Sequence, residues 1–179
     1  MADSTAGGTT MKLLRPTIEY KQQVLEYKKE FIESGDDLAG TCNLQEYDVY
    51  EEWMKFVSDN EKESTKQTAV TADLFLAIRE EDNRLVGMIN IRHALTEYLF
   101  KFGGHIGYSV RKNERRKGYA KQMLRMALDE CRNLGIDKVL ITCDSENIAS
   151  ANTIKACGGI LENEVVADET IKQRYWITL

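Results

Sequence analysis

Two changes of hydrophobic period in the middle of the chain constrain the fold more than any other feature of the sequence. The segment HIGYSV (105–110) alternates in polarity, as a strand with one buried face does. Residues 119–134 then place apolar side chains at helical spacing, and KVLITC (138–143) is almost entirely apolar, which is typical of a strand buried on both faces. A helix that joins two strands in this way predicts a crossover and a parallel strand pair.

The pattern on either side of this unit predicts further helices and an antiparallel hairpin. The hairpin strands are rich in branched and aromatic residues and are separated by the turn sequence EDN. We therefore expect an α/β fold with a mixed, mostly antiparallel central sheet flanked by helices. The predicted elements, in chain order, are a strand at 11–16, helices at 17–35 and 43–62, strands at 73–80, 84–95 and 105–110, a helix at 119–134, a strand at 138–143, a helix at 147–159, and strands at 160–166 and 173–179.

The chain has 179 residues, which suits a single domain with a sizeable core, and we place this domain at residues 11–179. Residues 1–10 (MADSTAGGTT) are small and polar, so we expect a disordered lead-in there. They lack the basic and apolar regions of a signal peptide, and no apolar run approaches the roughly 20 residues that a membrane helix needs. These features predict a cytoplasmic protein that does not bind a membrane.

The cysteine and histidine residues do not form a metal-binding pattern. The four cysteines lie far apart in the sequence, none of them forms a C-x-x-C pair, and the two histidines are His93 and His105. Because the chain shows no export signal, we expect reduced thiols and no bound metal.

Positive charge is concentrated just before the helix at 119–134, although the net charge of the chain is −5. Five of the seven residues at 111–117 are lysine or arginine, and Gly118 follows them. Basic side chains at a helix N-terminus oppose the helix dipole and cost roughly 0.3–1 kcal/mol each, whereas an anion bound there would be stabilised. The turn therefore indicates either a phosphate site or a solvated turn that is basic for no functional reason. The phosphate patterns G-x-x-x-x-G-K-[ST] and G-x-G-x-x-G are both absent.

Two motifs resemble those of the GNAT family of N-acetyltransferases. RRKGYA (115–120) is similar to the family's pyrophosphate loop, [RQ]-x-x-G-x-[GA], and it lies at the predicted start of a helix. NIAS (147–150), with CGG at the end of the same predicted helix, resembles a second family signature near the C-terminus. The resemblance covers residues 11–179, and the predicted order of strands and helices also looks like the family's fold. It implies an acetyl-CoA-dependent N-acetyltransferase.

The resemblance also implies that acetyl-CoA lies where two adjacent parallel strands splay apart, which here are 105–110 and 138–143. The backbone of the first strand would bind the pantetheine arm, and free N–H groups at the start of the helix would bind the pyrophosphate. Nearby basic side chains would add charge-assisted hydrogen bonds, so the positive turn would serve a cofactor's phosphates and not a nucleic acid. The cofactor-binding residues implied in this way are Tyr108, Ser109, Val110, Arg115, Arg116, Lys117, Gly118, Tyr119, Ala120, Lys121, Asn147 and Ser150.

The implied reaction is direct transfer of an acetyl group to an amine. An amine with a pKa of about 10.4 is mostly protonated at neutral pH, so it needs a base or a chain of water molecules before it can attack. His105 is the candidate catalytic base, because it opens the strand that would bind the pantetheine and its ordinary pKa, about 6.5, lies near neutrality. The alternatives are that His105 is structural, or that water deprotonates the amine with help from Glu97 or Tyr98.

The proton donor for the leaving thiolate is not identified by the sequence. Many members of the family carry a tyrosine seven residues after the asparagine of the second motif, but this chain has Ile154 there. Cys157, Tyr98 and Tyr175 are the candidate donors, and Cys157 is also explained as a small residue at a tight helix end. The missing tyrosine keeps a second function open, that of an acyl-CoA-binding module without catalysis.

The sequence identifies the acceptor only as an amine. The acidic net charge argues against a nucleic-acid partner, which would favour a basic domain. The C-terminal segment RYWITL (174–179) is a candidate for pairing across a homodimer, and the oligomeric state stays open. An acidic helix face either attracts a cationic acceptor or is simply solvated, and its members are Glu46, Asp48, Glu51 and Glu52.

Overall fold

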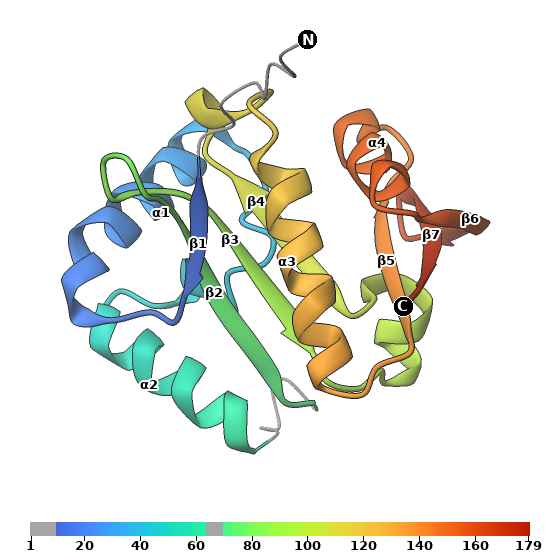
Figure 1. Ribbon diagram of the computed structural model, residues 1–179, viewed down its shortest axis with the longest axis horizontal. Coiled ribbons are helices and arrows are strands. Elements are labelled where there is room, and N and C mark those ends of the chain that lie inside the picture. The colour runs from blue at the N-terminus through green and yellow to red at the C-terminus, as the bar shows by residue number, and fades with distance from the viewer. Residues whose placement is uncertain (1–9, 64–69) are drawn as a thin grey trace, which may run out of the picture.

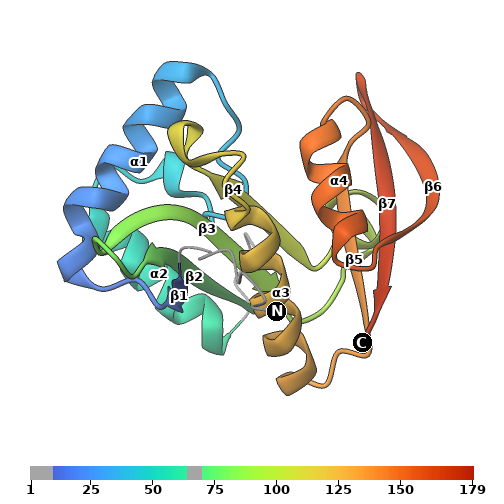
Figure 2. The ribbon, with the colours of Figure 1, turned by 45° about the horizontal axis from the view of Figure 1, so that its top comes forward.

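The computed structural model describes residues 10–63 and 70–179 (Figures 1 and 2). Of the predicted lead-in at 1–10, only Thr10 lies within the described residues. The strands are β1 (Met11–Leu14), β2 (Ala72–Arg79), β3 (Arg84–Arg92), β4 (Ile106–Val110), β5 (Lys138–Asp144), β6 (Ile160–Ala167) and β7 (Thr170–Thr178). The helices are α1 (Lys21–Ser34), α2 (Tyr50–Lys62), α3 (Tyr119–Asn133) and α4 (Ile148–Ala156), with short 3-10 turns at Ile18–Tyr20, Leu44–Glu46 and Lys112–Glu114 and a π-helical turn at Leu99–Gly103.

The first sheet contains β1 to β4 in sequence order, and every neighbouring pair is antiparallel. Both faces of this sheet are covered, which explains why β2 and β3 are apolar at almost every position. On one face, Leu74 and Leu76 pack in a core with α1 and α2. On the other face, Phe75 and Ala77 pack in a second core with α3. The second core continues into the remainder of the fold, since it also includes residues of β5, β7 and α4.

The remaining strands form a second antiparallel sheet in the order β5-β7-β6. Both views show this sheet and α4 standing to one side of the first sheet, with β4 and β5 at the junction (Figures 1 and 2). Within the described residues no ladder pairs these two strands, so the predicted parallel pair is not hydrogen-bonded along its length. An isolated antiparallel bridge joins Gly104, just before β4, to Ile141 in the middle of β5. The predicted α/β fold with a mostly antiparallel sheet is confirmed, and the splayed strand pair is the place where the sheet divides.

A segment between β3 and β4 that the sequence left unassigned is held by arginines from both sheets. It includes the π-helical turn Leu99–Gly103. Arg92 of β3 donates to the Gly104 carbonyl at 3.0 Å. Arg174 of β7, which is only 4% exposed, donates to the Phe100 carbonyl at 2.9 Å. The segment therefore ties the two sheets together beside the strand split.

The C-terminal strand is not free to pair across a dimer, which corrects that expectation. β7 lies between β5 and β6 and is hydrogen-bonded along both of its edges. The two edge strands of this sheet are β5, on the side of the strand split, and β6. In the described part of the chain, no helix has the length and apolar character that crossing a membrane requires.

Candidate active site

β4 presents an open backbone edge toward β5. The hydrogen bonds to β3 at the two ends of the strand run from the Arg92 N–H to the His105 carbonyl and from the Arg111 N–H to the Val86 carbonyl. Alternate residues of an antiparallel strand bond to the same neighbour, so Tyr108 and Val110 turn their backbone groups away from β3. Within the described residues, β4 has no second ladder partner. This edge is thus able to take an extended ligand as an added strand.

Ser109 does not share this position, although the sequence placed it with its neighbours. Its register partner is Met88, and the alternation turns its backbone groups toward β3. Its hydroxyl is buried on the α1 side and pairs with the Tyr27 hydroxyl at 2.9 Å. The structure therefore brings Tyr108 and Val110 to the cleft edge, and it places Ser109 in the packing beneath α1.

The start of α3 presents a run of free backbone N–H groups. The first helical hydrogen bond runs from the Gln122 N–H to the Gly118 carbonyl at 3.1 Å, and no acceptor in the described chain binds the N–H groups of residues 116–121. Left-handed and other backbone conformations alternate along this turn. Arg116 has a φ of +62° and Gly118 a φ of +83°, and Lys117 between them is not left-handed. Such alternation aims successive N–H groups at one point, and the helix dipole adds to their attraction for an anion.

Gly118 keeps this turn both bent and open. Its φ of +83° lies in the left-handed region, and a Cβ built on it would meet no heavy atom within 4 Å. The protein itself does not fill the space above Gly118, so a phosphate can approach the backbone closely there.

Two basic side chains of the turn have carboxylate partners within the described chain, and their role in binding an anion stays a prediction. Arg115 binds Asp36 at 2.8 Å, and its Nε donates to the Val110 carbonyl at 3.0 Å. Lys117 binds Glu114 at 2.8 Å. Within residues 10–63 and 70–179, Arg116 is the basic residue of the motif without an ion pair. An anion at this turn would be held chiefly by backbone N–H groups.

Glu114 pairs with one of the five basic residues at 111–117, Lys117, and with two arginines of the neighbouring strands. Its side chain is 5% exposed and binds Arg79 at 2.8 Å, Arg84 at 3.1 Å and Lys117 at 2.8 Å. Burial by itself would raise the pKa of this carboxyl, but hydrogen bonds from Lys117 and Arg79 outweigh it and hold the pKa below its usual value. The buried carboxylate of Glu114 therefore links the turn before α3 to β2 and β3 by ion pairs.

The second motif forms the start of α4 and reaches across the cleft to β4. The Ser150 N–H donates to Asn147 Oδ1 at 3.1 Å, so Asn147 caps the helix. The Ser150 hydroxyl pairs with the Tyr108 hydroxyl at 2.8 Å, and burial raises the pKa of Tyr108 to about 12. Sequence reasoning chose these residues separately and missed this pair, because nothing local links two positions so far apart in the chain.

His105 joins the beginnings of β4 and β5. The backbone N–H of His105 donates to the Leu140 carbonyl at 2.7 Å, and the backbone N–H of Leu140 donates to the ring Nδ1 of His105 at 3.0 Å. Burial, and then the positive charge of Arg92, lower the pKa of the ring, which is 7% exposed. The lone pair that would accept a proton from an amine is already engaged at Nδ1. The catalytic role of His105 stays a prediction beside this structural one.

The candidate proton donors occupy very different environments. Ile154, in place of the family's tyrosine, is fully buried in the core, and so is Tyr175. Tyr98 is 68% exposed. Cys157 Sγ donates to the Lys121 carbonyl at 3.8 Å, so this thiol lies beside the start of α3.

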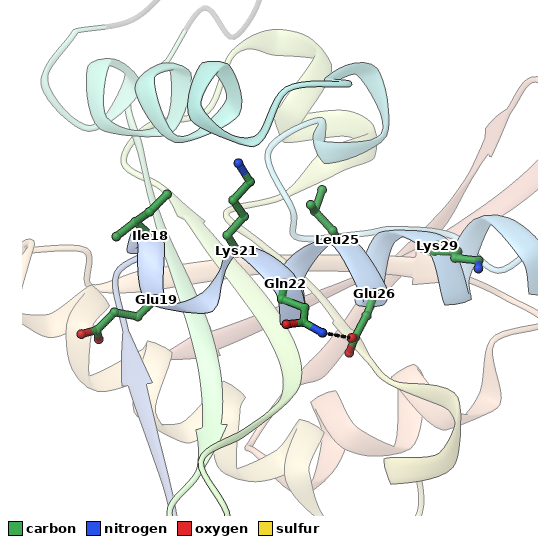
Figure 3. Close-up of a pocket in the computed structure, with 7 residues that line it drawn as sticks. All are labelled: Ile18, Glu19, Lys21, Gln22, Leu25, Glu26 and Lys29. Carbon is green, nitrogen blue, oxygen red and sulfur yellow. Dashed lines mark hydrogen bonds between the residues drawn. The ribbon is translucent and has the colours of Figure 1, made fainter.

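Two hollows lie on the side of α1 and α2. One, of about 510 Å³, follows the outer surface of α1, where Lys21 stands between Ile18 and Leu25 (Figure 3). It contains none of the predicted site residues. The other, of about 530 Å³, is lined by the loop 37–43 and by residues of α2, β2 and β3. The second pocket borders the cleft strand, because a Cβ on Gly40 would lie only 2.6 Å from the Cα of Tyr108.

The acidic helix face is not part of this second pocket. None of its four members lines the pocket, and Glu51 instead pairs with Lys21 at 2.6 Å. Among the residues that the structure describes, no group of three or more side chains is placed to hold a metal ion.

The sequence from residue 44 to residue 158 matches the model of the acetyltransferase (GNAT) family. The chain belongs to the GNAT family of acetyltransferases. The matched range contains RRKGYA (115–120), NIAS (147–150) and the strand split between β4 and β5. The family assignment and the fold that the motifs implied are therefore confirmed.

Solved acetyltransferases resemble this GNAT protein in fold at low sequence identity. An acetyltransferase from Salmonella typhimurium that modifies the N-terminal serine of a 50S ribosomal subunit protein has a TM-score of 0.66 and 19% identity over 96% of each chain. RimL, a ribosomal alpha-N-protein acetyltransferase solved with coenzyme A, has a TM-score of 0.70 and 18% identity over 96% of this chain and 95% of its own. A spermidine N-acetyltransferase chimera from Vibrio cholerae and hSSAT has a TM-score of 0.65 and 15% identity over 94% of each chain. The sequence matched none of the curated proteins with which it was compared.

Proposed function

We propose that this acetyltransferase takes acetyl-CoA as its acetyl donor and transfers the group directly to an amine. The observation that carries the proposal is the position of the free N–H groups of residues 116–121 next to the open edge of β4. A cofactor with a charged pyrophosphate at one point and an extended, amide-bearing arm beyond it suits both features. The neighbours' acceptors include an N-terminal serine and spermidine, so the resemblance does not select one amine.

Each part of the cleft suits one part of acetyl-CoA. The N–H groups at the start of α3 would bind the pyrophosphate oxygens, and Gly118 leaves the room for them. Backbone groups of Tyr108 and Val110 would bind the amides of the pantetheine arm. Asn147 caps α4 through Oδ1, and its Nδ2 has no acceptor within the described residues, so these donors would face the same arm from the side of α4. The cosubstrate supplies the activated acetyl group, and the chain orients it and keeps it apart from bulk water.

The amine must lose a proton before it attacks, and the structure leaves two routes open. His105 would accept the proton only by releasing the Leu140 N–H from Nδ1. A water molecule in the cleft would accept it without disturbing that hydrogen bond. The water route supports a structural role for His105, and the two routes differ in what substitution of His105 should do.

We expect His105→Asn to retain near-normal stability and turnover, and His105→Ala to lose stability by about 1–3 kcal/mol. Asparagine can place an oxygen where Nδ1 accepts the Leu140 N–H, whereas alanine leaves that buried donor without a partner. The pKa of the His105 ring is lowered in the folded protein, so the unfolded chain binds a proton at a higher pH than the folded chain does. The stability that the neutral His105 ring contributes to the wild-type protein is therefore lost as pH falls below about 6.5. Thermal unfolding and kcat/KM, measured from pH 5 to pH 8, test both statements. Loss of turnover in both variants, together with loss of the acidic limb of the pH profile, would instead establish the base.

A direct test of the proposed function is the release of CoA from acetyl-CoA in the presence of a panel of amines. We expect at least one amine to accelerate CoA release and to gain an acetyl group in equal amount, as judged by mass spectrometry. Tight binding of acetyl-CoA without transfer to any amine would contradict the proposed reaction. It would support the acyl-CoA-binding module that the missing tyrosine kept open.

A further inference from the structure

The pocket beside β4 contains a buried polar group without a partner. Asn90 of β3 is 4% exposed and lines the pocket of about 530 Å³. Its Oδ1 is fully buried, and the side-chain amide makes no hydrogen bond within the described residues. A buried amide normally finds partners, so one that lines a cavity and lacks them points to a ligand.

Asn90 lies one strand away from the open edge that faces β5. Its register partner on β4 is Gly107, which directly precedes Tyr108. A Cβ built on Gly107 would lie 2.9 Å from Asn90 Oδ1, so the glycine leaves the amide undisturbed. Neighbouring strands are about 4.8 Å apart, so an arm added at the β4 edge lies roughly 10 Å from β3, a span that the Asn90 side chain, one hydrogen bond and one acceptor residue together can cover.

The pocket's charges indicate what kind of amine it accepts. Its lining includes one carboxylate, from Asp37, and one guanidinium, from Arg92. Arg92 is partly engaged, since it donates to the Gly104 carbonyl at 3.0 Å. A polyamine would favour several carboxylates, and the described residues of this lining carry no net charge. An amide, which is one donor group and one acceptor group, matches a peptide unit.

The protonation of the amine points in the same direction. At pH 7.5, roughly a third of α-amino groups are neutral at a pKa near 7.8, compared with about one in a thousand lysine side chains at a pKa near 10.4. A pocket with a single carboxylate in its lining therefore suits an α-amine, which needs less help to lose its proton.

We propose that the Asn90 amide binds the acceptor, and that the acceptor is an α-amine on an uncharged, peptide-like body. The inference rests on the proposed function and narrows it. Asn90 hydrogen-bonds the first peptide unit, and this bond holds the α-amine toward the acetyl group at the β4 edge. The residue selects and positions the acceptor, and it takes no part in binding acetyl-CoA.

The test compares three kinds of acceptor. Tripeptide amides of varied first residue, such as Ala-Ala-Ala amide, offer a free α-amine, Nα-acetyl-lysine amide offers a lysine side-chain amine, and spermidine offers the amines of a polyamine. We expect the peptides to give a kcat/KM at least about tenfold higher than either of the others at pH 7.5. Asn90→Leu and Asn90→Ala should raise KM for the best peptide by about tenfold, the value of one lost hydrogen bond, and leave KM for acetyl-CoA unchanged. Asn133→Leu, at the exposed end of α3, is the matched control and should change neither constant.

Stability separates this role from a structural one. An unpaired buried amide does not stabilise the fold, so Asn90→Leu should keep or raise the melting temperature. A lowered melting temperature with an unchanged peptide KM in both Asn90 variants would overturn the proposal. Preference for spermidine or Nα-acetyl-lysine amide, or transfer to none of the peptides while acetyl-CoA still binds, would overturn it and leave the proposed function standing. Failure to bind acetyl-CoA at all would overturn both.

Discussion

Replacing Gly118 by valine should weaken acetyl-CoA binding by about a hundredfold or more. The valine Cβ would stand in the open space above the turn, and a branched side chain resists the left-handed φ of +83°. Loss of two charge-assisted hydrogen bonds to the pyrophosphate, at about 1.5 kcal/mol each, accounts for a factor of this size. Calorimetric titration with acetyl-CoA measures the effect directly.

Gly135 provides a control at the other end of the same helix. It also has a left-handed φ, +75°, and a Cβ built on it would also meet no heavy atom within 4 Å. Gly135→Val should therefore cost about the same backbone strain, roughly 1–2 kcal/mol, without touching the anion site. Equal losses of acetyl-CoA affinity in the two variants would show that Gly118→Val acts only through stability, and the anion site would then be wrongly placed.

Replacing Glu114 by alanine should lower the free energy of unfolding by about 3–5 kcal/mol. The substitution leaves Arg79, Arg84 and Lys117 without the buried carboxylate that neutralises them. The turn before α3 would lose its fastening to β2 and β3, so we also expect weaker binding of acetyl-CoA. Urea unfolding, with acetyl-CoA titration of the variant below its unfolding midpoint, measures both effects.

An exposed partner of the same arginine gives the comparison. Asp82 binds Arg79 at 2.7 Å from the surface, and Asp82→Asn should have little effect on stability. The pKa of Glu114 is lowered in the folded protein, so its contribution is present above the ordinary value of about 4.5 and is lost as pH falls below it. If Glu114→Ala costs no more than Asp82→Asn, the ion cluster is not what holds the turn.

The architecture could be predicted from the sequence because hydrophobic period is a local signal. The strand at 138–143 and the helix at 119–134 appear as β5 and α3 within a residue or two. The helix predicted at 43–62 begins later, at Tyr50, because its first part forms a separate 3-10 turn. The π-helical turn Leu99–Gly103 was missed, since one of the two arginines that hold its segment, Arg174, comes from a strand far along the chain.

The site divides in the same way between local and distant features. The turn at 115–120 could be proposed as an anion site because a glycine, basic residues and a helix start are neighbours in the sequence. The partners of its side chains could not be predicted from the sequence. Asp36, for example, lies far from Arg115 in the chain, and only the fold brings their side chains to 2.8 Å. The pairing of His105 with Leu140 and the unpartnered amide of Asn90 likewise exist only once β4 has a place between β3 and β5.

The most direct test of the account is to follow every backbone amide by nuclear magnetic resonance while acetyl-CoA is added. In the proposed arrangement, backbone N–H groups, more than basic side chains, hold the cofactor along the strand split. This arrangement predicts that the largest shifts belong to residues 116–121, Tyr108 and Val110, and that Ser109, whose N–H faces β3, moves less than its neighbours. Unmoved resonances at 116–121, with the shifts gathered instead along the outer surface of α1, would contradict it.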